Sequence, residues 1–249
     1  MVAGFRFISC AVLALAALTS GCENKVEDGR AASSRAFPRA DRPVSNLGAN
    51  GFSSETERDS VNEARTVMDL AGIAKGMSVA DLGAGEGYYT VRLAQRVGSE
   101  GRVLAQDIDS EALRNLGLRI ERERLDNVSI KQGAEDDPRL PANSFDRVML
   151  VHMYHEVGEP YAFLWHLRPA LRPGGSVVVV DVDRPTESHG IPPALLFCEF
   201  EAVGFRLAEF VRKPKMQGYY ARFEAKGAAP APEAIRPCRL AGSAPAAAR

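Results

Sequence analysis

The sequence has little that would mark a membrane-spanning or nucleic-acid-binding protein. It contains no run of about 18 or more apolar residues, so a stable transmembrane helix is not expected. Its net charge is only -1 and it has no basic, aromatic-interleaved patch, which argues against a nucleic-acid partner. Its four cysteines have no spacing typical of a metal site. What is present is an ordinary globular composition, 45% hydrophobic and 25% charged, in a chain long enough for one sizeable domain.

The first 22 residues differ from the rest of the chain. Arg6 precedes an apolar stretch over residues 7–18, and small residues then lead to Cys22, as in a secretory signal. The Ser-Gly-Cys ending resembles a bacterial lipoprotein cleavage site, although Thr19 stands where that pattern usually has Leu. The resemblance implies export to the periplasm or anchoring in the outer membrane through a lipidated Cys22. Plain secretion, a buried N-terminal helix and a cytoplasmic protein with an unused signal are the alternatives.

The remaining cysteines bear on the compartment. Cys10 would be removed with the signal, which leaves Cys198 and Cys238. These two could pair in an oxidising compartment. Since Cys198 lies in an apolar segment, the alternative is a small buried hydrophobic residue.

The chain divides into four parts by composition. After the signal, residues 23–52 lack periodicity and are predicted to be a flexible tether. Residues 227–249 are rich in Ala and Pro and are predicted to be disordered. Residues 53–226 form the predicted domain, without internal repeats.

Strand-like and helix-like segments alternate through this domain. Buried strands separated by crossover helices indicate a mostly parallel sheet covered on both faces. We therefore predict an α/β, Rossmann-like fold with a seven-stranded sheet, the last strand being close enough to its neighbour to be antiparallel. The predicted strands are 78–82, 102–107, 128–132, 147–151, 176–183, 205–211 and 219–225, and the predicted helices are 53–73, 88–97, 110–124, 161–171 and 193–203.

The most informative segment follows the first strand. Asp81 ends the strand, and Gly83, Gly85 and Gly87 follow at every second position before a helix that begins at Tyr88. Glycine lets the backbone turn sharply and lets a ligand approach it closely. Free amides at the start of the helix then face that ligand. The pattern predicts a nucleotide-type cofactor pocket.

A second carboxylate is expected at the same pocket. Asp107 ends the second strand, where it can accept hydrogen bonds from ribose hydroxyls, and Ile108 follows it. Asp109 is expected to cap the next helix instead. A nicotinamide dinucleotide site is the alternative, but its third glycine would come one residue later. A carboxylate at Asp81 would also repel a pyrophosphate, whereas it would attract an ammonium.

The spacing Asp-x-Gly-x-Gly-x-Gly resembles the first motif of class I S-adenosylmethionine (SAM)-dependent methyltransferases. Residues 133–136, 140–146 and 172–175 resemble that family's adenine loop, the lead into its fourth strand and the turn into its fifth. Residues 59–225 are similar to a group of exported bacterial methyltransferases. The resemblance implies SAM as cofactor and a reversed last strand. Asp81 and the glycines, with Tyr88 beside them, would hold the methionine portion.

The adenine loop departs from the family. Ala134 stands where many relatives have Asp, so Glu135 or Asp136 would contact the adenine, and the residues do not decide between them. Two solvated loop acids are the alternative.

The acceptor end is predicted just past the fourth strand. His152 and His155 could take a proton from an acceptor, and Tyr154 could line the pocket. Packing or hydrogen bonding to the loop is the alternative for the two histidines. No metal site is expected from these histidines because no second cluster of ligands accompanies them.

The function expected from these features is methyl transfer from SAM to a small molecule. A non-catalytic SAM-binding or structural lipoprotein and an NAD-type oxidoreductase are the alternatives. The acceptor and the oligomeric state are left open.

Overall fold

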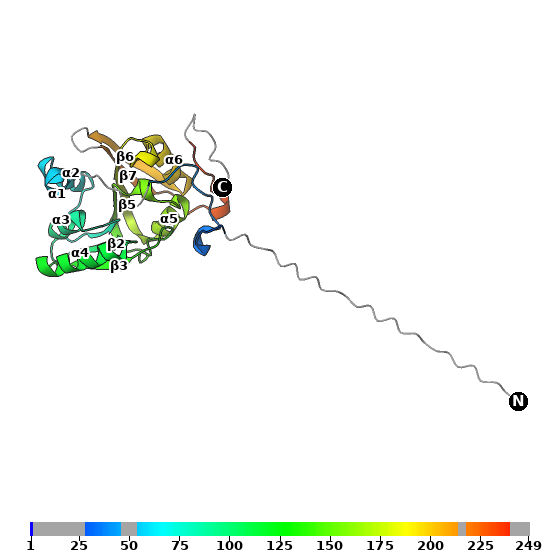
Figure 1. The fold of residues 1–249 in the computed structure, drawn as a ribbon, viewed down its shortest axis with the longest axis horizontal. Helices are drawn as coiled ribbons and strands as arrows, with labels where there is room; N and C mark the ends of the chain where they lie inside the picture. The colour runs from blue at the N-terminus through cyan, green and yellow to red at the C-terminus, as the bar shows by residue number, and fades with distance from the viewer. Residues whose placement is uncertain (2–27, 46–53, 214–217, 240–249) are drawn as a thin grey trace. The chain divides into compact units, whose positions relative to one another are not determined.

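A seven-stranded sheet forms the centre of the protein (Figure 1). The computed structural model describes residues 1, 28–45, 54–213 and 218–239, so the predicted signal and Cys22 lie outside the described residues. The strand order is β3-β2-β1-β4-β5-β7-β6. The strands are β1 (Ser78–Leu82), β2 (Arg102–Asp107), β3 (Val128–Gln132), β4 (Phe145–Val151), β5 (Leu171–Asp181), β6 (Phe205–Lys213) and β7 (Gly218–Ala225).

One strand of the sheet is reversed. β7 runs antiparallel to both of its neighbours, β5 and β6, while the remaining pairs are parallel. The predicted fold class, with its reversed last strand, is therefore confirmed. The parallel order also places the carboxyl ends of β1, β2, β4 and β5 at one edge of the sheet, where ligands bind in folds of this kind.

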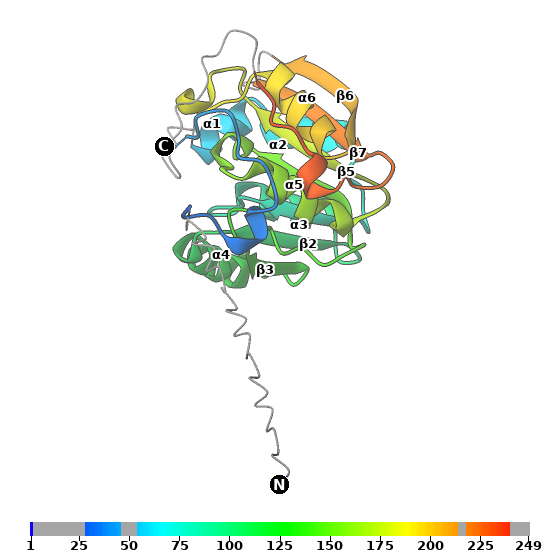
Figure 2. The same ribbon diagram turned by 90° about the vertical axis from the view of Figure 1, so that its right-hand side faces the viewer.

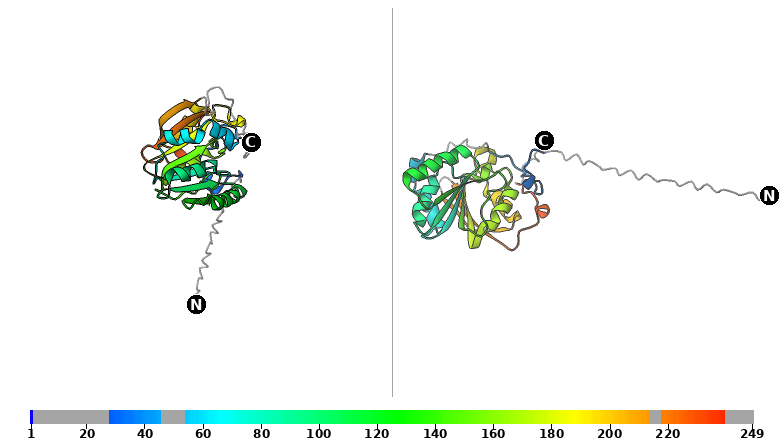
Figure 3. Two further views of the ribbon diagram at one scale, coloured as in Figure 1. Left: turned by 90° about the vertical axis from the view of Figure 1, so that its left-hand side faces the viewer. Right: turned by 90° about the horizontal axis from the view of Figure 1, so that it is seen from below.

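Helices cover both faces of the sheet (Figure 3). On β5, Val177 and Val179 pack in a cluster with α5 and α6, whereas Val178 and Val180 pack in the cluster that includes α2 and α3. Such alternation follows from the two-residue period of a strand, and apolar residues on both faces are typical of a buried parallel strand. The helices are α1 (Glu55–Ser60), α2 (Glu63–Leu70), α3 (Tyr88–Val97), α4 (Ser110–Glu123), α5 (Pro160–Leu167) and α6 (Pro193–Ala202).

Two predicted helices differ from the structure, and the strand predicted over 176–183 runs over Leu171–Asp181. The helix predicted over 53–73 is two helices, because Asn62 takes a left-handed conformation with φ 53° between them. Ser54 starts the first of these with a capping box to Glu57, as its sequence predicts. The helix predicted to reach residue 171 ends at Leu167, and a short 3-10 turn containing Pro169 follows it.

The tether prediction is wrong for residues 31–45. This segment lies across the face that carries α5 (Figure 2). Phe37 is buried in the core with its ring 5.6 Å from that of Trp165. Arg42 forms a buried ion pair with Glu199 at 2.8 Å. A segment without periodicity can thus still supply core residues, which composition alone does not show.

The tail prediction is likewise wrong for residues 227–239. Ile235 is buried, and Cys238 forms a disulfide with Cys198 of α6, with the Cα atoms 5.9 Å apart. The interpretation of Cys198 as a buried hydrophobic residue is also wrong, because Cys198 is exposed and disulfide-bonded. Among the described residues, no helix is long and apolar enough to cross a membrane.

Candidate active site

The predicted glycine bend joins β1 to α3. Gly83, Gly85 and Gly87 have φ values of 67°, 52° and 89°, a left-handed region that favours glycine. The amide of Gly87 donates to the carbonyl of Ala84 at 2.9 Å, and Gly87 is the N-cap of α3. The chain therefore reverses within five residues and presents the first turn of α3 at the carboxyl edge of the sheet.

The three glycines serve different purposes. A Cβ atom at Gly83 would lie 2.9 Å from the Met153 side chain, and one at Gly87 would lie 2.4 Å from Leu116 Cδ1, so close packing requires glycine at both positions. A Cβ atom at Gly85 would meet no atom within 4 Å. The bend thus opens onto free space at Gly85, as a bound cofactor requires.

Asp107 lies against this open position. Its Oδ2 accepts a hydrogen bond from the Gly85 amide at 2.8 Å, and its Oδ1 accepts one from the Asp109 amide at 3.0 Å. The carboxylate is partly exposed, and each of its oxygens can accept further bonds. Asp109 caps α4 through the Glu111 amide at 2.8 Å, as predicted. The partly buried Ile108 lies beside Asp107, and its carbonyl accepts from Gln132 Nε2.

Asp81 lies beneath the bend. It is 3% exposed and accepts a hydrogen bond from the Thr90 hydroxyl at 2.6 Å. Burial raises the pKa of Asp81 to about 6, although the Thr90 hydroxyl acts in the opposite direction by stabilising the ionised form. Asp81 therefore ties the end of β1 to the first turn of α3, and its ionisation changes near neutral pH.

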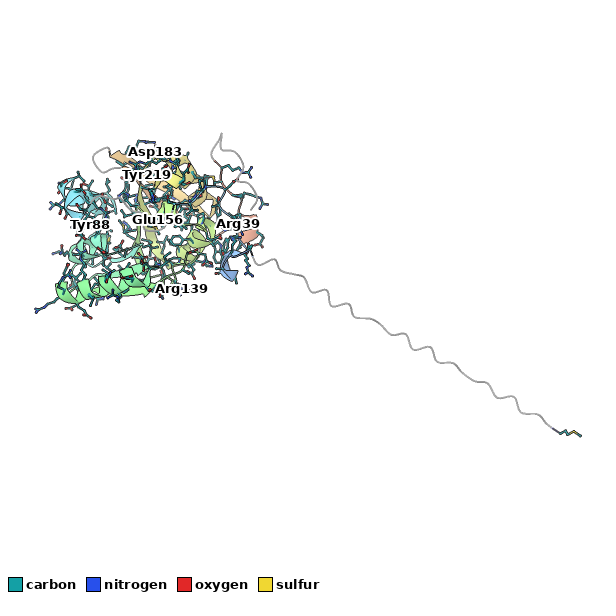
Figure 4. All side chains as sticks on the ribbon, in the orientation of Figure 1. Arg39, Tyr88, Arg139, Glu156, Asp183 and Tyr219 are labelled. Carbon is teal, nitrogen blue, oxygen red and sulfur yellow. A yellow bond between two sulfur atoms is a disulfide. The ribbon has the colours of Figure 1, made fainter. Side chains whose placement is uncertain are left out.

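Tyr88 does not face the open side of the bend. Its hydroxyl donates to Asp59 at 2.9 Å, and its ring lies between the guanidinium groups of Arg58 and Arg92, each 3.8 Å from the ring centroid. Figure 4 shows Tyr88 on the side of α1 and α3. The structure thus places Tyr88 between helices, where it holds α1 against α3, and not in the wall of the space at Gly85.

The two candidate adenine contacts are in different surroundings. Asp136 is 2% exposed and accepts a hydrogen bond from the hydroxyl of Ser33, in the segment 31–45. Its backbone carbonyl also lies 2.9 Å from His166 Nδ1. Glu135 is exposed. Asp136 therefore binds the N-terminal segment. Glu135, which is exposed, remains the candidate for the adenine contact.

His152 is directed toward α2. Its Nε2 lies 3.5 Å from Glu63, which also accepts hydrogen bonds from Tyr89 and Arg58. Burial would raise the pKa of Glu63, but His152 and Arg58 outweigh it and lower that pKa to about 2. A left-handed φ of 55° gives His152 this direction. His152 thus joins β4 to α2.

Tyr154 is turned into the core. It is fully buried, its hydroxyl donates to Glu199 at 2.8 Å, and its ring packs against Phe200. The prediction that Tyr154 lines the donor pocket is therefore wrong. Tyr154 begins a short 3-10 turn, η2 (Tyr154–Glu156), whose other residues face differently.

His155, in the same turn, is held by a carboxylate. Its Nδ1 lies 2.9 and 3.1 Å from the two oxygens of Asp181, the last residue of β5. Since an ionised carboxylate only accepts hydrogen bonds, Nδ1 carries the proton in the neutral ring. His155 Nε2 lies 3.9 Å from Glu156, and the His189 ring is edge-on at 5.7 Å. At the predicted acceptor end, a polar cluster of Glu156, Asp181 and His189 thus accompanies His155.

Sequence reasoning missed Asp181 and His189. Asp181 ends β5 as Asp107 ends β2, and Asp81 lies one residue before the end of β1, so the same pattern could have indicated Asp181. His189 follows a short turn far from β4 in sequence, and no local pattern points to it.

Two hollows in the surface lie away from this edge. One lies between α2 and α3 and is lined by Asn62, Met68 and Arg96, among others. The other lies at the start of β5, around Pro173 and Gly174. Neither is lined by a residue of the glycine bend, by Asp107 or by His155, so neither belongs to the candidate site.

Comparisons with known proteins find similar methyltransferases. Residues 79–175 match a family described as a methyltransferase domain. The UbiE ubiquinone/menaquinone biosynthesis C-methyltransferase of Pasteurella multocida is 30% identical over 128 residues, which cover 49% of this chain and 46% of that protein. Its counterpart in Idiomarina loihiensis is 29% identical over 126 residues, 50% of each chain. This chain thus spans about half the length of the curated relatives it matches.

Solved structures agree on the fold. A SAM-dependent methyltransferase from Aquifex aeolicus has a TM-score of 0.59 at 22% identity, over 70% of this chain and 98% of that one. The [4+2]-cyclase SpnF has a TM-score of 0.56 at 18% identity, over 72% and 69%. The matched domain and the curated relatives are thus methyltransferases, and the solved structures show that the fold is shared with a SAM-dependent methyltransferase.

Proposed function

We propose that this protein transfers a methyl group from SAM to a small-molecule acceptor. The observation that carries the proposal is the open position at Gly85, with Asp107 hydrogen-bonded to the same residue. A nucleoside can approach the backbone there, and its ribose hydroxyls can donate to the carboxylate. The match of residues 79–175 to a methyltransferase domain supports the same conclusion.

The parts of the cofactor would have separate partners. The glycine bend and Asp81 would hold the methionine portion, Asp107 with Ile108 would hold the ribose, and Glu135 would face the adenine. Bound SAM supplies an already activated methyl group on a sulfonium. The protein then has to align donor and acceptor and exclude water, and such positioning can lower a barrier by roughly 7–11 kcal/mol.

The acceptor would bind beyond the ends of β4 and β5. Of the three predicted catalytic residues, we place only His155 there, because His152 is bonded to α2 and Tyr154 is in the core. The curated relatives are named C-methyltransferases, so carbon is one candidate acceptor atom. The acceptor molecule itself is not identified by this comparison.

We also propose that the protein is exported and anchored through a lipidated Cys22. The signal-like residues 1–22 support export, and the Cys198–Cys238 disulfide is of the kind that persists in oxidising compartments. The mass of the protein recovered from its native membranes tests this directly. A chain that begins at Cys22 and carries acyl groups is the expected result, and an intact Met1 would contradict it.

Calorimetry and a transfer assay test the main proposal. We expect the purified protein to bind SAM and S-adenosylhomocysteine but not NAD, and to release S-adenosylhomocysteine when a small-molecule extract is added. Binding of NAD without SAM would instead establish an oxidoreductase. Binding of SAM without transfer to any extract would favour the non-catalytic alternative; a [4+2]-cyclase has a similar fold, so the fold alone does not require methyl transfer.

A further inference from the structure

We propose that His155, Glu156 and His189 form a site for a divalent transition-metal ion that binds the methyl acceptor. The site itself stands on the geometry of these three residues, and its role toward the acceptor rests on the proposed function. The sequence predicted no metal site because no second cluster of ligands accompanies His152 and His155. The structure brings His189 to His155 from the segment between β5 and α6.

The three side chains already converge. Each offers one ligand atom, and these atoms all lie within 4.8 Å of one another. Bonds of about 2.0–2.2 Å to a metal ion would place neighbouring ligand atoms roughly 3–4 Å apart. His155 Nε2 and Glu156 Oε1, at 3.9 Å, are at that separation already. Small side-chain rotations would therefore complete the site.

A carboxylate fixes the first ligand. Asp181 accepts from His155 Nδ1, which leaves Nε2 as the coordinating atom. Asp181 Oδ1 is itself held by the Val182 amide at 2.7 Å. A carboxylate behind a histidine is the usual outer support of a metal-binding imidazole, where it sets the tautomer and raises the basicity of the other nitrogen. A fully buried His155 with this support is already oriented for coordination.

The backbone fixes the last ligand. His189 has a left-handed φ of 55°, a strained conformation for a non-glycine residue. Its amide donates to Ser45 Oγ at 3.2 Å, and Ser45 is bonded in turn to the carbonyl of Thr186. The Nδ1 atom of His189 is buried without a hydrogen-bond partner among the described residues. Coordination would supply that partner and would account for the strained backbone.

The donor set and position suggest the chemistry. Two imidazoles and one carboxylate suit Zn²⁺ or Fe²⁺ and leave at least one position open. The site lies past the ends of β4 and β5, and Met153, two residues before His155, contacts the glycine bend at Gly83. The open coordination position would thus bind an acceptor hydroxyl or thiol beside the space proposed for SAM.

Coordination would replace a general base. A bound metal lowers the pKa of a coordinated hydroxyl or thiol, so the acceptor releases its proton to water. The acceptor oxygen or sulfur then forms a bond to the methyl carbon while the methyl–sulfonium bond breaks and its electron pair stays on sulfur. The products are the methylated acceptor, S-adenosylhomocysteine and one proton.

Metal titration of the full chain tests the site. After treatment with EDTA and dialysis, we expect calorimetry with Zn²⁺ alone to show one ion bound per chain, and bound Co²⁺ to give visible absorption. His189→Asn should abolish both signals, and Asn tolerates the left-handed backbone at that position. Asp181→Asn should weaken Zn²⁺ binding by about 10- to 100-fold. His166→Ala, on α5, is the matched histidine control and should bind Zn²⁺ as the wild type does.

The outcomes separate this site from the proposed function. Zn²⁺ and Co²⁺ binding that His189→Asn does not change, or no binding at all, would overturn the metal site. In that case His155 and Asp181 would remain a candidate base and its positioning residue. SAM affinity should stay within about twofold in His189→Asn. A wild-type protein that binds Zn²⁺ but not SAM would overturn the proposed function and leave the metal site standing.

Discussion

One half of the candidate site is formed by the backbone, and the other half is formed by side chains. At the ends of β1 and β2, the backbone of the glycine bend makes the site, and Asp107 is bonded to a backbone amide. At the ends of β4 and β5, the site is made of side chains, and His155 and Asp181 are fully buried. The first half therefore depends on chain conformation and open space, and the second depends on charges that neighbours must neutralise.

The largest expected effect tests the backbone half. Gly85→Val would fill the open space beside the bend, so we expect SAM binding to fall below detection in calorimetry. Gly76→Val is the matched control, because Gly76 has a left-handed φ of 81°, lacks neighbours within 4 Å of an added Cβ, and lies at the other end of β1. Undiminished SAM affinity in Gly85→Val would contradict the placement of the cofactor.

Arg42→Met tests the side-chain half. Arg42 is paired with Glu199 and also donates to the carbonyls of His155 and Val157 at 3.4 and 3.1 Å. Removing the guanidinium leaves the buried Glu199 carboxylate without its cation, which typically costs about 3–5 kcal/mol of unfolding free energy. Urea denaturation measures the loss. The exposed Arg39, in the same segment, provides the control, and Arg39→Met should change stability by less than about 0.5 kcal/mol.

Arg42→Met also tests whether the two halves depend on each other. If the halves are independent, folded Arg42→Met at low temperature should bind SAM as the wild type does. A large loss of SAM affinity would show that the N-terminal segment also supports the glycine bend.

The raised pKa of Asp81 predicts that the unfolding free energy depends on pH. The pKa of Asp81 is about 6 in the folded protein and about 3.8 when unfolded, so the folded state holds more protons between these values. Stability from this group therefore decreases as pH rises from about 4 to 6 and is constant above that, by about 3 kcal/mol in total. Asp81→Asn cannot titrate. Its unfolding free energy relative to the wild type should thus increase by that amount over the same window.

Thr90→Val provides a second measurement of the same effect. Loss of the hydroxyl removes a hydrogen bond that stabilises ionised Asp81, so the decrease in stability should become larger and extend to higher pH. A wild-type and Asp81→Asn pair whose difference does not change between pH 4 and 7 would contradict the raised pKa.

The smallest effect concerns the ribose contact. Asp107→Ala should weaken SAM binding by roughly 10- to 100-fold, since a hydrogen bond to a charged group contributes roughly 1.5–3 kcal/mol. Asp109→Ala removes a neighbouring carboxylate that caps α4, and its SAM affinity should not change. Equal losses in the two variants would mean that the effect comes from a disturbed helix and not from the ribose.

The sequence predicted the backbone half better than the side-chain half. Glycine spacing and strand ends are local, so the bend, the reversed strand and the capping role of Asp109 were all predictable. The convergence of Asp181 and His189 on His155 depends on tertiary packing between segments far apart in sequence. The hydrogen bond from Ser33 to Asp136 also depends on tertiary packing. The sequence of a segment without periodicity does not indicate where that segment binds.

Because residues 31–45 pack against the domain, the smallest chain that folds stably has to include them. The domain predicted from the sequence would trim the chain to 53–226, and that cut would remove Phe37 from the interior and leave Glu199 as a buried charge without its cation. It would also discard Cys238 and the crosslink to α6. A recombinant chain should therefore begin before residue 31 and extend past residue 238, since an inactive shorter product would report a damaged interior and not an absent activity.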